Sequence, residues 1–355
     1  GDPEPDWINS INEIKVKTIF HAAKEKGYIT ACCHWPVCAY GNEYIDYLIP
    51  EVWTKKTDGD MVARYEECGA TGVMDIVKKN SYRLKWKYFP MYDEFITDCV
   101  CDIIREKNPD VMFVHYSEID HLRHKHGLFG HKITEGLCRI DDWVGQILNA
   151  VRQTDAFDKT NIVITSDHGH LEVKRNIHLN TLLVKEGLIT LNSDNTVAAW
   201  DAFILSAGLS AQVYLKRPDD KTLYQRVYGL LNKMAEDGLY GFNEVYTAEE
   251  VQSKFNLSGE FSFVIETDGY SRFGNRLTGS VVQQLDFSDY NYSYGSHGHM
   301  PSKGPQPTFL CMGPDFKEGV IIKSGRIIDQ APTYAKILGV DLPEADGKPI
   351  DMLLK

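Results

Sequence analysis

Residues 161–169 read Asn-Ile-Val-Ile-Thr-Ser-Asp-His-Gly, a short apolar run that leads directly into two titratable side chains. The β-branched residues predict a buried strand over 161–165, so Asp167 and His168 should lie at its carboxyl end. Charged groups at the end of a buried strand are costly unless they bind something. Because ligands of open α/β sheets bind at the carboxyl ends of the strands, this stretch predicts a fold class and the place of a site.

The same order of elements occurs earlier in the chain. Residues 111–114 (Val-Met-Phe-Val) predict another buried strand, and the polar cluster with Asp120 and His124 follows it. Apolar residues three and four positions apart predict a helix before each strand, over 92–107 and 133–151. Strands that alternate with helices predict an α/β protein whose mostly parallel sheet is covered on both faces.

The pattern changes between residues 206 and 289. We expect a smaller α+β cap there, inserted into a core domain that comprises residues 1–205 and 290–355. The elements expected in the cap are strands over 211–215 and 261–266 and a helix over 222–237. After the cap the core resumes with a strand over 308–312 and a helix over 332–338.

Composition excludes some classes of partner. The formal net charge of -12 argues against a nucleic-acid polymer, which basic surfaces bind. No apolar run approaches the roughly 18 residues of a membrane helix, so we expect no membrane partner. The eight cysteines show no regular spacing and no CxxC pair, which predicts reduced thiols and a cytoplasmic location. The sequence leaves the oligomeric state open.

A third polar cluster, Gly295-Ser296-His297-Gly298, adds another imidazole to the two Asp and two His residues above. Each cluster alone is a weak signal, since Asp120-x3-His124 can be a solvated surface pair and the glycine-flanked cluster a flexible turn. Carboxylate oxygens together with imidazole nitrogens suit a divalent ion such as zinc, and five ligands exceed what one catalytic zinc takes. The set therefore predicts two metal ions, with manganese or iron as alternatives to zinc.

The three motifs at 120–127, 166–169 and 295–298 together resemble the metal motifs of the alkaline phosphatase superfamily, most closely its type I phosphodiesterase/nucleotide pyrophosphatase branch. Supporting matches are Trp35-Pro36, Arg139-Ile140-Asp141, His178-Leu179-Asn180, Gly313-Pro314, 329–333 and 342–347. The resemblance implies a three-layer α/β/α sandwich and a two-metal phosphoester hydrolase. It also implies that Asp120, His124 and His297 hold one zinc, and that Asp167 and His168 hold the second.

The chain departs from the family pattern before Asp120. In the family, an Asp at the end of the first strand and a Thr or Ser nucleophile complete the second site, but no segment here offers that pattern. Residues 1–7 look like the loop that follows the nucleophile, so we expect the nucleophile upstream of Gly1 and catalysis by these 355 residues to be impaired.

Three alternatives to a phosphodiesterase stay open at this point. The chain can be a catalytically silent metal-binding fragment of the fold, or the full-length protein can have phosphonoacetate hydrolase or phosphomutase activity. A sulfatase is disfavoured, because its Cys-x-Pro-x-Arg motif does not occur in the sequence.

Aromatic side chains near the metal motifs are candidates for substrate binding. Tyr290, Tyr292 and Tyr294 lead into His297, and a ring beside a phosphoester site can stack on a nucleobase, although the tyrosines can equally brace the loop. Trp35 can line either the core or a pocket. We therefore expect a small phosphoester or nucleotide-like substrate, contacted by Tyr294, Trp35 and His299.

Overall fold

The computed structural model describes residues 7–52, 60–85, 88–285 and 295–355. It divides into two compact units. The core unit contains residues 7–119, 135–167 and 308–355, and the second unit contains residues 120–134 and the described part of 168–307. Among the described residues, no helix combines the length and the apolar composition that a membrane span requires.

The core unit is built on short parallel strands. Strand β1 (Thr30–Cys33) lies between β2 (Tyr47–Ile49) and β3 (Val111–Val114) and pairs with both in parallel. All four residues of β1 are buried, which explains why this strand is continuously apolar or small. In the same unit, β4 (Ile162–Thr165) pairs antiparallel with β16 (Phe309–Met312).

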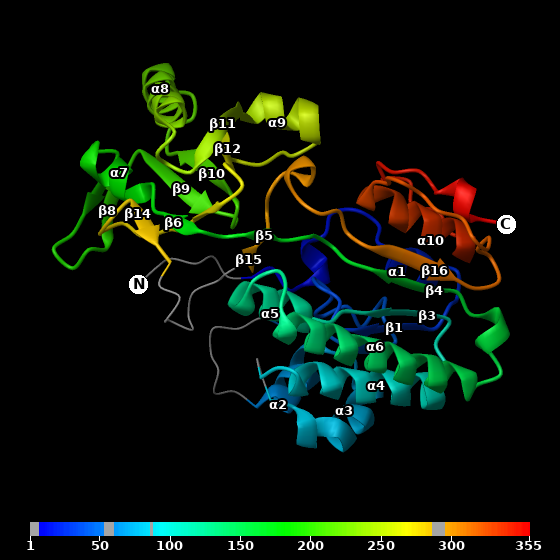
Figure 1. The fold of residues 1–355 in the computed structure, drawn as a ribbon. Coiled ribbons are helices and arrows are strands. Elements are labelled where there is room, and N and C mark those ends of the chain that lie inside the picture. The colour runs from blue at the N-terminus through cyan, green and yellow to red at the C-terminus, as the bar shows by residue number, and fades with distance from the viewer. Residues whose placement is uncertain (1–6, 53–59, 86–87, 286–294) are drawn as a thin grey trace. The chain divides into compact units, whose positions relative to one another are not determined.

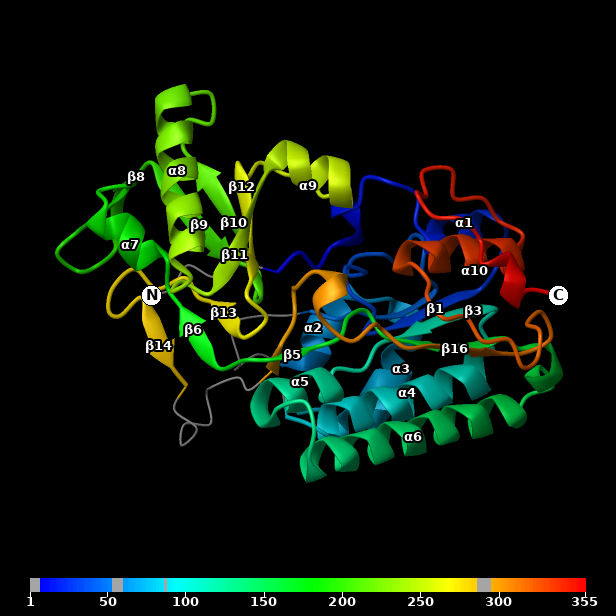
Figure 2. The same cartoon turned by 45° about the horizontal axis from the view of Figure 1, so that its top comes forward.

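Helices cover both sides of these strands. Helices α4 (Met91–Lys107) and α6 (His131–Arg152) lie on one side, whereas α1 (Ile19–Glu25) and α10 (Gln330–Leu338) lie on the other (Figures 1 and 2). The core unit is therefore a three-layer α/β/α arrangement, as predicted. Helices α2 (Met61–Cys68) and α3 (Met74–Asn80) complete its described α-helices.

Helix α4 shows why the predicted elements form. Its apolar residues recur three and four positions apart and become one buried stripe. The helix ends at Asn108, whose φ of 46° is the left-handed conformation that Asn tolerates after a helix. Pro109 follows and disfavours continuation of the helix, which delivers the chain directly into β3.

The second unit contains a four-stranded antiparallel sheet in the order β11-β12-β10-β9. Its strands are β9 (Ala202–Ser206), β10 (Ser210–Leu215), β11 (Phe242–Thr247) and β12 (Phe263–Thr267). Helix α8 (Lys221–Asp237) buries Val227 and Leu231 in the same apolar cluster as Phe263.

Smaller elements complete the second unit. They are β5 (Leu171–Glu172), β6 (Arg175–Ile177), α7 (Asn180–Lys185), β7 (Ile189–Leu191), β8 (Val197–Trp200), α9 (Ala248–Phe255), β13 (Ser271–Phe273), β14 (Val282–Gln284) and β15 (Gly295–Ser296). Strand β6 pairs with both β13 and β14, and β15 pairs with β5.

The predicted cap boundary between 205 and 206 does not coincide with a boundary of this unit. Residues 202–206 form β9, which pairs with β10 across a turn where Ser206 lies opposite Ala211. Gly208 in that turn has a φ of 84°, a conformation that favours glycine. Because hydrogen bonds of the sheet join both sides of the predicted boundary, the compact unit extends back to His168.

Candidate metal centre

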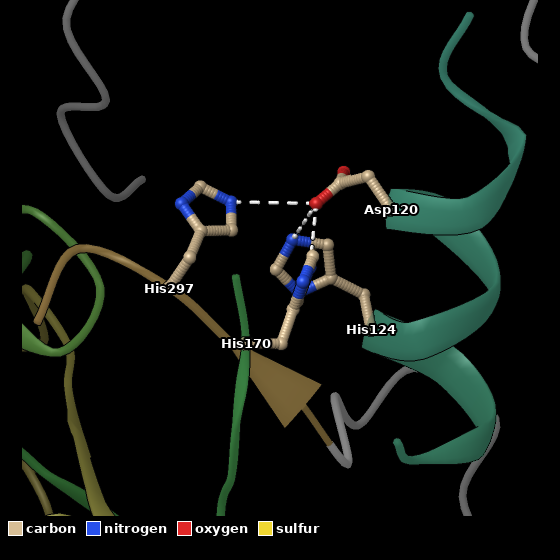
Figure 3. A group of neighbouring side chains, drawn as sticks. All are labelled: Asp120, His124, His170 and His297. Carbon is tan, nitrogen blue, oxygen red and sulfur yellow. Dashed lines mark hydrogen bonds and ion pairs between the residues drawn. The ribbon is translucent and has the colours of Figure 1, made fainter. Parts of the chain in front are cut away.

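Four side chains of the second unit converge on one point. Asp120 and His124 come from helix α5 (Glu118–His126), His170 directly precedes β5, and His297 directly follows β15. One ligand atom from each side chain lies within 4.8 Å of all the others. Figure 3 shows the three imidazoles directed towards the Asp120 carboxylate.

Two local patterns bring these residues together. Asp120 and His124 are four residues apart on α5, so the helix places them on one face. Strands β5 and β15 pair antiparallel, with Leu171 opposite Ser296. One step along that register, His170 and His297 face each other although more than a hundred residues separate them.

The distances identify a common centre at one carboxylate oxygen. Asp120 Oδ1 lies 2.8 Å from His170 Nε2, 3.1 Å from His124 Nε2 and 3.5 Å from His297 Nε2. Burial disfavours the charged carboxylate, but hydrogen bonds from His124 and His170 outweigh it and hold the pKa of Asp120 well below its usual range. Asp120 is therefore an anion at neutral pH.

The imidazoles of His170 and His297 favour the neutral state that binds a metal. Burial, followed by the proximity of His168, lowers the pKa of His297 to about 4. Burial also lowers the pKa of His170, which is almost inaccessible to solvent. Burial acts in the same direction on His124, but its hydrogen bond to Asp120 prevails and raises its pKa.

Backbone contacts orient His124. Its Nδ1 lies 2.8 Å from the carbonyl oxygen of Gly295, and because a carbonyl only accepts, Nδ1 must carry the proton. When Nε2 gives up the proton that it shares with Asp120, its lone pair faces the centre, which is the arrangement expected for a metal-binding His with a supporting carbonyl. A Cβ at position 295 would lie 2.8 Å from the carbonyl oxygen of Arg123, so this close approach requires glycine.

The donor set fits a divalent ion. Three imidazole nitrogens and one carboxylate oxygen, gathered in one partly buried cluster, are the ligands that zinc takes in proteins. The structure thus brings together the predicted residues Asp120, His124 and His297. It places Asp120 and His124 on helix α5 rather than leaving them as a solvated surface pair.

Sequence reasoning missed His170. The residue follows the Ser-Asp-His-Gly motif directly, but a single His after Gly169 carries no periodicity or spacing signal. Only the pairing of β5 with β15 shows that His170 is directed to the same point as His297. The one cue that the sequence offers is that His170 is a titratable residue directly beside a metal motif.

The other predicted site residues have varied surroundings. The His168 ring stacks on that of His297 with 3.8 Å between centroids, yet His168 does not belong to the four-residue group. Asp167 follows β4 in the core unit. Their shared role as ligands of a second ion stays a prediction.

The predicted substrate residues lie in different parts of the chain. In the core unit, Trp35 packs edge-on against Phe113 with ring centroids 4.9 Å apart. A contact of this kind is typical of a core side chain. In the second unit, Nδ1 of His299 is buried and has no hydrogen-bond partner among the described residues. Tyr294 lies outside the described residues.

A model of the type I phosphodiesterase/nucleotide pyrophosphatase family matches residues 1–298. The chain belongs to this family. Mouse ectonucleotide pyrophosphatase/phosphodiesterase family member 7 is 22% identical over 255 residues, which cover 71% of this chain and 52% of the relative. The bis(5'-adenosyl)-triphosphatase of Pongo abelii is 22% identical over 245 residues, covering 67% of this chain and 46% of the relative.

Solved structures of this family share the fold. Murine ectonucleotide pyrophosphatase/phosphodiesterase 5, in an inactive form and in complex with AMP, superimposes with a TM-score of 0.62 at 16% identity, covering 96% of this chain and 75% of that chain. The human counterpart gives the same TM-score, identity and coverage. The chain spans about half the length of the curated relatives it matches. Membership of the family confirms the alkaline-phosphatase-like fold.

Proposed function

We propose that the full-length protein hydrolyses small phosphoesters, with nucleotide-like compounds as the preferred substrates and zinc as the first candidate metal. The convergence of Asp120, His124 and His297 on one partly exposed point carries this proposal. A divalent ion bound there would polarise a phosphoryl oxygen and offset the charge that develops during displacement. The proposed substrate class draws support from the AMP complex of the murine relative and from the dinucleotide triphosphate in the name of another.

We further propose that Asp167 and His168 contribute to a second ion and that a Thr or Ser nucleophile on a segment outside this chain completes that site. The topology of the core unit is compatible with such a segment. Within the described residues, β3 pairs only with β1 and β4 pairs only with β16. Each strand therefore retains an edge to which a further strand can add.

A direct test combines metal analysis with a substrate panel. The full-length protein, freed of metal and then reloaded with zinc, should hydrolyse a p-nitrophenyl phosphodiester faster than the corresponding monoester or phosphonoacetate. Asp120→Asn should abolish both zinc retention and turnover, whereas Asp194→Asn, at an exposed loop position, should change neither. A full-length protein that binds no metal and shows no metal-stimulated turnover would refute the proposal.

The catalytically silent alternative is favoured by the unmatched nucleophile motif and has its own test. Residues 1–355 alone should bind metal at the four-residue centre but should not turn over the diester. Turnover by these residues would show that they already contain the nucleophile, and the proposal of a separate segment would fail. The same measurement in the full-length protein separates loss of catalysis from loss of metal.

A further inference from the structure

His170 makes the shortest contact of the metal centre. Its Nε2 lies 2.8 Å from Asp120 Oδ1. Nε2 of His124 lies 3.1 Å and Nε2 of His297 lies 3.5 Å from the same oxygen. Figure 3 shows the ring of His170 beside that of His124, directed at this oxygen. A histidine in this position either supports Asp120 through a hydrogen bond or binds the metal ion itself.

The three distances separate His170 from the other two imidazoles. Two donor atoms on one tetrahedral zinc lie about 3.3 Å apart, because each lies about 2.0 Å from the ion. The distances from Asp120 Oδ1 to His124 and His297 lie on either side of that value. The 2.8 Å distance to His170 is shorter, and it is an ordinary length for an N–H···O hydrogen bond.

The lone pairs of Asp120 are sufficient for one hydrogen bond and one metal ion. An ionised carboxylate only accepts, so Nε2 of His170 is the donor in this contact. One carboxylate oxygen has about two lone pairs. If one of them accepts the proton of His170, Oδ1 keeps the other for an ion held with His124 and His297.

We propose that His170 is a positioning residue, which donates a hydrogen bond to Asp120 Oδ1 and is not itself a metal ligand. This inference rests on the proposed metal binding and deepens it. The hydrogen bond fixes the plane of the carboxylate and directs its free lone pair at the ion. With three protein ligands, one position of a tetrahedral zinc stays open for a phosphoryl oxygen.

The backbone on both sides of His170 is held in place, as a positioning role requires. On one side, Leu171 in β5 pairs with Ser296 in β15. On the other side, a Cβ at Gly169 would lie 2.3 Å from the carbonyl oxygen of Pro305, so the chain packs closely against that residue. The ring therefore starts from a fixed backbone, and its hydrogen bond restricts the carboxylate rather than the reverse.

The other ring nitrogen argues against a purely structural role for His170. Nδ1 is buried and has no hydrogen-bond partner among the described residues, and only 3% of the residue is exposed. The ring therefore loses a hydrogen bond that it would make in water. An apolar side chain would avoid that loss, so the contribution of the imidazole is its bond to Asp120.

X-ray absorption tests the assignment without measuring activity. The parent protein for this test is the 355-residue chain carrying Asp167→Asn, which removes a predicted ligand of the second ion. Loaded with one equivalent of zinc, the parent and its His170→Ala variant should both show two imidazoles in the first shell. Three imidazoles in the parent would identify His170 as a ligand and overturn the assignment.

Zinc affinity measures the support that His170 gives. His170→Ala should weaken zinc binding by roughly the 10–100-fold typical of a lost supporting contact. His170→Gln, whose side-chain N–H can replace that of Nε2, should recover most of this loss. An unchanged affinity in His170→Ala, or a glutamine variant that binds no better than the alanine variant, would contradict positioning through the hydrogen bond.

His178→Ala is the matched control. His178 is also a buried histidine of the second unit, and its Nε2 lies 3.0 Å from Gln283 Oε1. Its loss should lower thermal stability and leave the zinc affinity unchanged. If His170→Ala fails to fold, the number of imidazoles in the parent and in His170→Gln still decides.

The outcomes separate this inference from the proposed function. A parent protein that binds zinc through three imidazoles refutes the role of His170 and leaves metal binding intact. A parent protein that binds no zinc at all refutes the proposed metal centre itself.

Discussion

Asp93 of helix α4 accepts a hydrogen bond from the backbone N–H of Glu118, the first residue of α5, at 2.8 Å. The same oxygen, Oδ2, accepts the N–H of Ser117 at 3.1 Å. Asp93 is fully buried, and it thus serves as the N-terminal cap of a helix from a distant part of the chain. The capped first turn is the one that also contains Asp120.

Replacing Asp93 should destabilise the protein through the loss of this cap. Asp93→Ala leaves two N–H groups without an acceptor, and we expect the free energy of unfolding to fall by about 1–3 kcal/mol. Asp93→Asn retains an oxygen acceptor and should cost less. Urea unfolding of the metal-free protein measures both. Asp98→Ala is the control, since Asp98 lies on the same helix and pairs with Arg83 and Tyr82 near the surface. Equal losses for Asp93→Ala and Asp98→Ala would contradict the capping role.

The pH dependence of stability should also report on Asp93. Burial raises the pKa of this carboxyl to about 7, from an ordinary value of about 4 for Asp, although the two N–H groups oppose the shift. Between those values the folded protein holds a proton that the unfolded chain has released. The free energy of unfolding therefore falls as pH rises from about 4 to about 7.

Asp93→Asn cannot titrate, so its stability relative to the parent protein should increase across the same interval. Urea unfolding at pH 5, 6, 7 and 8 gives the comparison. Glu118, which raises the pKa of Asp93, and His115, which lowers it, remain in both proteins. Parallel pH profiles for the two proteins would show that Asp93 does not titrate in this range.

Local signals in the sequence were sufficient to predict elements of the core unit such as helix α4 and strand β3. The predicted helix over 92–107 differs from α4 by one residue, because apolar periodicity and the Asn108-Pro109 break both lie within the segment. The strand over 111–114 coincides with β3. The expected disposition of helices on both faces followed from their alternation with strands.

The sequence did not show which strands pair when they lie far apart along the chain. His170 reaches the centre only because β5 pairs with β15, and the two strands are two residues long, too short for a period to show. The pairing of β9 with β10 across residue 206 is a similar case, since no local signal in the sequence marks that hairpin. The Asp120-x3-His124 motif identified both residues. The segment around them is short and polar, so its sequence did not show that it forms a helix.

Gly298 should be required for the geometry beside His297. Its φ is 91°, and a Cβ at this position would lie 2.1 Å from the carbonyl oxygen of Ala207. Gly279 has a similar φ of 95° and open space around it, so Gly279→Ala isolates the cost of the left-handed conformation, about 1–2 kcal/mol. Gly298→Ala should lower the free energy of unfolding by more than that and should weaken zinc binding, because the displaced backbone carries His297. Equal effects of the two variants in urea unfolding and zinc titration would show that Ala207 yields to the added methyl group.

The ion pair between Glu118 and Arg139 should contribute more to the free energy of unfolding than the partial exposure of Arg139 suggests. Arg139 Nε lies 2.8 Å from Glu118 Oε1, and the Glu118 side chain is only 1% exposed. Arg139→Met leaves the buried carboxylate without its partner, so we expect a loss of about 3–5 kcal/mol in the free energy of unfolding. Lys336→Met is the control, because the pair of Lys336 with Asp351 is exposed on both sides and should contribute at most about 1 kcal/mol.

The double variant Arg139→Met/Glu118→Gln separates the value of the pair from the cost of an unpaired charge. With the carboxylate neutralised, most of the stability lost in Arg139→Met should return, which a double-mutant cycle records as a large coupling energy. Asp93 holds the same turn through the backbone of Glu118, so the glutamine variant keeps the start of α5 in place. Additive losses in the cycle would mean that Arg139 stabilises α6 by packing alone and contradict a coupling between the two side chains.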